Sequence, residues 1–107
     1  MSKSGKLERD IQDLVWLEAD KYGAILWRNN TGAYKVGNRY VRFGLCVGSS
    51  DLIGLTRDGR FLAIEVKRGN KKPEPEQQKY IDFVNAKGGL AFFINENNIS
   101  DIEKYLK

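Results

Sequence analysis

The stretch that decides the fold is DLIGLTRDGRFLAIEVK, residues 51–67. Two runs rich in apolar residues, 51–56 and 60–67, flank Arg57-Asp58-Gly59, a turn sequence whose glycine tolerates positive φ. This spacing predicts an antiparallel β-hairpin. We expect its two strands to form the centre of a sheet.

The flanking segments predict helices. Residues 7–22 repeat apolar side chains at helical spacing and end at Gly23, and residues 76–87 do the same before Gly88-Gly89. A short final helix is predicted to begin near Ser100, because its hydroxyl and Glu103 three positions later fit a capping box.

The remaining segments predict further strands. Residues 24–28 form a short strand, and residues 90–94 form a continuous apolar strand of the kind covered on both faces. Residues 29–38, which contain two glycines, predict a loop, and residues 39–45 predict another extended piece. The order of elements predicts an α/β fold with a mixed central β-sheet flanked by helices.

The size of the chain predicts one domain. It has 107 residues, and Leu, Ile, Val and Phe supply 29 of them, above the roughly 20% below which chains tend not to fold. We therefore expect a single domain over residues 1–107, with 1–6 as a flexible tail.

The composition excludes several classes of chemistry. There is no histidine and only one cysteine, so the chain can build neither a Ser-His-Asp triad nor a Cys/His zinc site. We expect Cys46 to be a buried small hydrophobe, in a chain suited to a reducing compartment. No apolar run approaches the ~18 residues of a membrane span, and residues 1–6 lack a signal-peptide core, which predicts a soluble intracellular protein.

Positive charge is concentrated in the middle of the chain. Residues 21–72 hold 11 Lys and Arg against three acids, whereas the whole chain carries only +4. This distribution favours a phosphate-binding surface, although a solvated basic face fits it equally well. The basic candidates for nucleic-acid contact are Arg28, Arg39, Arg42, Arg68 and Lys71.

The predicted hairpin brings chemically active side chains together. Strand alternation places Glu65 and Lys67 on one face, and Asp51 falls opposite them at the far end of the partner strand. Two carboxylates this close would repel unless a cation lay between them, and Mg²⁺ prefers oxygen ligands. The Val66 carbonyl is a further candidate ligand. Lys67 could assist the attacking water or neutralise the phosphate.

A different interpretation of Glu-x-Lys alone is an ordinary salt-bridged sheet surface, because structural ion pairs outnumber catalytic ones. The addition of Asp51 after Gly48-Ser49-Ser50, in basic surroundings, favours a metal-dependent phosphodiester site.

Segments along nearly the whole chain resemble a known family. Residues 48–54 (GSSDLIG) and 64–67 (IEVK) look like the PD-(D/E)XK nuclease core, and specifically the VRR-NUC (virus-type replication-repair nuclease) family. Residues 27–33 resemble the Arg/Asn/Gly segment before that core, and 76–80 resemble its Gln-containing helix. Ser50 stands where the generic motif has Pro.

The resemblance implies a set of roles. Asp51 and Glu65 would bind Mg²⁺ or Mn²⁺ with the Val66 carbonyl, and Lys67 would assist the attacking water. Glu8 would be an outer or second-metal carboxylate, although a solvated helix residue is an equal alternative. Gln77, rather than Gln78, would orient substrate or water, with a purely helical role nearly as plausible. Asn30 joins the DNA-contact candidates from its place in the Arg/Asn/Gly loop.

The expected function is that of a divalent-metal-dependent, structure-selective DNA endonuclease. Similarity to single-domain phage enzymes implies a homodimer that resolves Holliday junctions, in the cytoplasm of a bacterial or phage-infected host cell. The alternatives are a non-catalytic nucleic-acid-binding module, a nuclease of flaps or linear DNA, and action on RNA.

Overall fold

The central sheet has four strands in the order β1-β4-β5-β6, in a computed structural model that describes residues 7–107. The strands are β1 (Ile25–Arg28), β4 (Leu52–Leu55), β5 (Phe61–Lys67) and β6 (Leu90–Asn95). β4 pairs antiparallel with β1 and β5, and β6 runs parallel to β5. The predicted central hairpin and the mixed sheet are confirmed, whereas the tail predicted over residues 1–6 lies outside the described residues.

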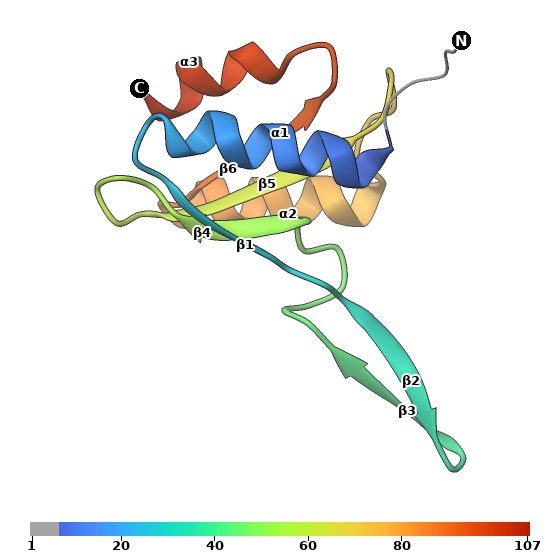
Figure 1. Ribbon diagram of the computed structural model, residues 1–107. Helices are drawn as coiled ribbons and strands as arrows, with labels where there is room; N and C mark the ends of the chain where they lie inside the picture. Colours follow the sequence, from blue (N-terminus) through green and yellow to red (C-terminus); the bar gives the residue numbers. More distant parts are fainter. Residues whose placement is uncertain (1–6) are drawn as a thin grey trace, which may run out of the picture.

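Helices cover the two faces of the sheet unequally (Figure 1). Helices α1 (Glu8–Asp20) and α3 (Ile102–Leu106) lie on one face, and α2 (Pro75–Ala86) lies on the other. The α/β class with flanking helices is therefore confirmed. None of the described helices is long and apolar enough to cross a membrane.

The main core lies between the sheet and α1. Alternate residues of β5 point into it, and Leu62, Ile64 and Val66 are fully buried against Ile11 and Val15 of α1. A smaller core forms under α2, where Ile81 and Val84 pack against Ala63 and Ala91 of the sheet. Glu65 and Lys67 alternate with the residues of the main core and share the α2 side of β5 with Ala63.

Gly54 allows β4 to pair closely with β1, the edge strand of the sheet. A Cβ at Gly54 would lie 1.8 Å from the Ile25 carbonyl oxygen, so no other residue fits at this point of β4 without moving the backbone of β1.

The loop predicted over residues 29–38 is wrong. Residues Gly32–Val36 form β2, which pairs antiparallel with β3 (Arg39–Phe43) in a separate two-stranded sheet that projects from the body (Figure 1). We call residues 32–43 the arm. Its signal was local: Gly37-Asn38 is a hairpin turn, with φ of +62° at the glycine, between two runs that contain the aromatic and β-branched residues favoured in strands.

Two smaller predictions are also wrong. Cys46 is exposed, because it lies in the loop between the arm and β4 and not in a strand. The Ser100 capping box does not form: a 3₁₀ turn (Ile99–Asp101) precedes α3, whose first turn has no side-chain cap.

Candidate active site

Three side chains meet where β4 begins and β5 ends. The Asp51 carboxylate accepts a 2.9 Å hydrogen bond from the Val66 amide, which holds it beside Glu65 on the neighbouring strand. The Lys67 ammonium lies 3.5 Å from Oε2 of Glu65. Strand register explains this convergence, because Leu52 pairs with Ile64 and the residue before β4 therefore falls opposite Glu65.

The charged forms of the two carboxylates are disfavoured in this environment, and Lys67 offsets this only in part. Burial raises the pKa of Glu65 to about 7, and the charge of Asp51 adds to this, while Lys67 opposes it. Burial also raises the pKa of Asp51, against the lowering effect of the Val66 amide and of Lys67. Such paired carboxylates are typical of functional sites.

The donor set fits a hard divalent cation. Glu65 is 2% exposed, and its buried Oε1 has no hydrogen-bond partner. An orphaned carboxylate oxygen is costly, and a metal ion would satisfy it. Within residues 7–107 no group of three or more His, Cys, Asp or Glu side chains could hold a metal ion, so backbone oxygen and water would complete the coordination.

Glu8 lies near this site, at the start of α1. Desolvation raises the pKa of Glu8, and the charge of Asp51 raises it further, whereas Lys67, Lys71 and Arg68 lower it. The fold therefore brings Glu8 within electrostatic reach of Asp51 from 43 positions away in the chain, although its side chain is exposed.

Gln77 caps a helix. Its Oε1 accepts a 2.8 Å hydrogen bond from the Glu74 amide, as one half of a capping box at the start of α2. Gln78 instead donates to Asp82, one turn along the exposed face of the helix. A structural role is thus present for Gln77 whether or not it also touches substrate.

Replacing Gln77 with Ala is expected to lower the free energy of unfolding by about 1 kcal/mol, because the Glu74 amide loses its partner. Gln78→Ala is the matched control and should cost less than about 0.5 kcal/mol, the value of an exposed pair one turn apart. Urea unfolding of both variants measures this. Equal effects would contradict the capping role.

Arg28 is already engaged by α1. Its Nε donates to Gln12 at 3.2 Å, its guanidinium forms an ion pair with Asp13, and it lies 5.3 Å from the centre of the Trp16 ring. These contacts tie β1 to α1 and neutralise the charge that was predicted to face nucleic acid.

The other predicted nucleic-acid residues are exposed and fall into two groups. Arg68 and Lys71 lie next to the active site, in the loop after β5. Arg39 and Arg42 lie on the arm, and Asn30 lies at its root. The structure thus places two of them beside the carboxylates and two on a projection.

Sequence reasoning missed Asn29, the neighbour of Asn30. Its amide nitrogen Nδ2 donates to Ser49 Oγ at 2.7 Å and to the Ser50 carbonyl at 3.0 Å, and its Oδ1 accepts from the Leu45 amide at 3.2 Å. Its backbone amide donates to the Asp51 carbonyl at 2.8 Å. Asn29 therefore joins both ends of the arm to the segment that holds Asp51. In the sequence, only its place in the Arg/Asn/Gly segment indicated a role for Asn29.

A mixed sheet flanked by helices, with paired carboxylates and a lysine at the end of its central strands, defines a nuclease-type, restriction-endonuclease-like fold. The VRR-NUC domain family matches residues 7–95. The chain belongs to this family, whose nucleases generally use divalent metals.

Solved structures support the same fold. A protein described as a VRR_NUC domain superposes with a TM-score of 0.60 at 19% identity, over 91% of this chain and 90% of the other. A second, a VRR_NUC domain protein, superposes with a TM-score of 0.59 at 21% identity, over 97% and 91%. No curated protein matches the chain in sequence.

Proposed function

We propose that this protein is a divalent-metal-dependent, structure-selective DNA endonuclease that hydrolyses phosphodiester bonds. One observation carries the proposal: Asp51 and Glu65 share a site in which an oxygen of the buried Glu65 has no partner, with the Lys67 ammonium 3.5 Å from its other oxygen. A structural ion pair gives no reason for the second, repelling carboxylate.

The side chains divide the chemistry among them. Asp51, Glu65 and the Val66 carbonyl would hold Mg²⁺ or Mn²⁺, which supplies electrostatic stabilisation for the charge that builds on the phosphate. Lys67 would orient the attacking water and neutralise negative charge beside it. Glu8 supplies a further carboxylate nearby, and Arg68 and Lys71 attract the DNA backbone.

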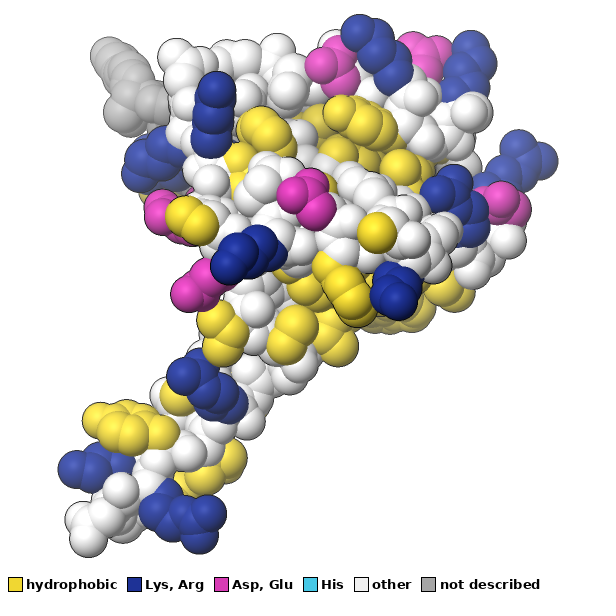
Figure 2. Space-filling model, turned by 180° about the vertical axis from the view of Figure 1, so that it is seen from behind, with side chains coloured by type: hydrophobic (Ala, Val, Ile, Leu, Met, Phe, Trp, Pro, Cys, Tyr) yellow, Lys and Arg dark blue, Asp and Glu magenta, His cyan; other side chains and the backbone are white. Residues whose placement is uncertain are grey.

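We propose that the protein acts as a homodimer, and the apolar face that α2 leaves open supports this. Ile25, Leu55 and Phe61 lie opposite one another on the α2 side of β1, β4 and β5, and Leu45 and Phe83 border a groove beside them. Figure 2 shows apolar side chains gathered where the arm leaves the body.

The area of this face approaches what each partner contributes to a standard protein–protein interface. With Trp27, these six side chains are between 36% and 59% exposed. Half-exposed side chains of this size offer on the order of 600 Å² together, against about 800 Å² per partner in a standard interface. A two-fold dimer would present two active sites to two strands, which suits a symmetric four-way junction.

Cleavage of end-labelled four-way junction, flap, nicked and linear duplex DNA tests the proposal, with Mg²⁺, Mn²⁺ or EDTA, by wild type and Glu65→Ala. We expect paired symmetric cuts in the junction that both EDTA and the substitution abolish. Cutting of flaps or linear DNA instead would overturn the junction preference alone. Binding without any metal-dependent cut would leave a non-catalytic DNA-binding module.

A further inference from the structure

The arm projects from the body, and none of the residues of the candidate active site lies in it. Its strands pair only with each other, and every residue in them is exposed. The radius of gyration is 14.6 Å, compared with about 13 Å for a compact chain of this length. An isolated two-stranded hairpin is only marginally stable in water, so an exposed hairpin such as the arm requires a further source of stability.

The arm is positively charged throughout. It holds Lys35, Arg39 and Arg42, and no Asp or Glu occurs anywhere between Asp20 and Asp51. No arm cation lies within ion-pair distance of a carboxylate in the part of the chain that the structure describes. These three charges are therefore available to an external partner.

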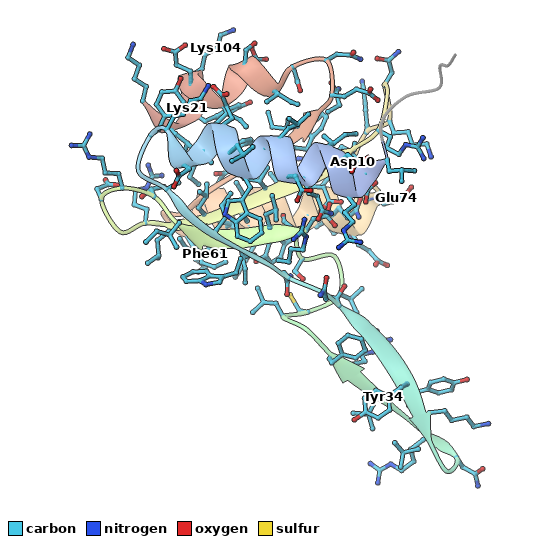
Figure 3. The ribbon with its side chains drawn as sticks, viewed as in Figure 1. Asp10, Lys21, Tyr34, Phe61, Glu74 and Lys104 are labelled. Carbon is cyan, nitrogen blue, oxygen red and sulfur yellow. The ribbon has the colours of Figure 1, made fainter. Side chains whose placement is uncertain are left out.

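Pairing register gives the arm two different faces. Lys35 lies opposite Tyr40 and Arg42 lies opposite Ala33, so one face carries two cations and a tyrosine. We call this the basic face. Tyr34 lies opposite Val41 on the other face, with its ring 6.2 Å from that of Phe43 (Figure 3).

The root of the arm is fixed to the catalytic segment. Asn29 hydrogen-bonds to Ser49, to Ser50 and to Leu45, and these residues lie directly before Asp51 or after the arm. The position of the arm relative to Asp51 is thus set by short polar contacts. A duplex held at the active site would lie at a defined place relative to the arm.

We propose that the basic face of the arm binds the DNA duplex away from the scissile phosphate, with Lys35 and Arg42 on phosphates. This inference rests on the proposed function, because it names a second contact with the same substrate. A two-stranded β-ribbon has the width to enter a major groove. Charge favours DNA over a second copy here, because two arms with three cations each and no carboxylate would repel.

The test compares Lys35→Ala/Arg42→Ala with the matched control Lys104→Ala/Lys107→Ala. The control removes two cations from α3, on the other side of the body from the arm (Figure 1), where they form only exposed ion pairs. A third protein replaces residues 32–43 with Gly-Gly, which is possible because Gly44 packs directly against Thr31. No residue of the buried core lies in the arm, so thermal unfolding should stay unchanged.

The measurement is fluorescence anisotropy of a labelled duplex and a labelled four-way junction in EDTA, from 50 to 200 mM salt. The logarithm of the association constant falls as the logarithm of the salt concentration rises, and the arm double variant should make this slope shallower by about 1.8, because two phosphate contacts are lost. Its binding should be roughly tenfold weaker than that of wild type. The control should bind within about twofold of wild type at the same salt.

The outcomes separate the two proposals. If wild type binds and cuts DNA while the arm variants bind equally well, the arm inference alone is overturned. If wild type binds no DNA, the proposed function falls as well. If sedimentation shows that the arm variants turn a dimer into monomers with unchanged binding per monomer, the arm holds a second copy and the DNA assignment is overturned.

Discussion

Replacing Glu65 with Gln is expected to lower metal-dependent DNA cleavage about 10³-fold or more, while the chain still folds and still binds DNA. Gln keeps the size of the side chain but removes the charge that would hold the metal ion. The buried Oε1 that has no partner in the metal-free protein would then be an uncharged amide oxygen. Single-turnover cleavage of labelled junction DNA, with excess enzyme, measures the loss.

The matched control is Glu103→Gln on α3. This carboxylate is exposed and pairs only with Lys107, so cleavage should stay within about twofold of wild type. Anisotropy in EDTA would show that both variants bind DNA. Cleavage by Glu65→Gln at a rate near that of wild type would remove Glu65 from the site and with it the main support for the proposed function.

Removal of divalent metal is expected to leave a protein whose free energy of unfolding falls as pH rises from about 4.5 to about 7. The pKa of Glu65 is raised from 4.5 to about 7, so the folded state retains a proton that the unfolded chain has already released. The favourable contribution is complete below 4.5 and is lost as pH passes 7. It amounts to at most about 3 kcal/mol, and the raised pKa of Asp51 acts in the same direction.

Mg²⁺ should reverse this loss at neutral pH. An ion that binds only the folded state adds about 2.7 kcal/mol at a hundred times its Kd, and each kcal/mol raises Tm by about 4–8 °C in a domain of this size. Thermal unfolding from pH 5 to 8, in EDTA and in Mg²⁺, measures both effects. Glu65→Gln should show a flatter profile and little response to Mg²⁺. A wild-type profile that rises with pH in EDTA would contradict the buried carboxylate pair.

Much of the fold and part of the site could be predicted because their causes are local. Alternation in residues 60–67 and the turn at Asp58-Gly59 act over a few positions, and they place Glu65 and Lys67 on one face and Asp51 opposite them. The same turn chemistry at Gly37-Asn38 would have revealed the arm. The two glycines instead favoured the interpretation of residues 29–38 as a loop.

Contacts between distant segments could not be predicted in this way. Whether Gln77 faces substrate or the Glu74 amide depends on the rotamer of its side chain. In the structure, the hydrogen bond at the start of α2 favours the rotamer that faces Glu74. The packing of α1 against β1 gives Arg28 an ion-pair partner, Asp13, that its place in the sequence did not indicate. Burial of Cys46 was inferred from its apolar neighbours, which in the fold line an open face.

The sequence by itself determined the strands of the central sheet and the helices, the pair of residues at the end of β5, and the membership of a nuclease family, because alternation, turn residues and ordered motifs are properties of neighbouring positions. Only the tertiary structure decided that Glu8 comes close to Asp51, that Asn29 joins the arm to the catalytic segment, and that the arm projects from the body. These relations join residues far apart in the chain, and they depend on how the burial of the main core orients α1 and β1 against the sheet.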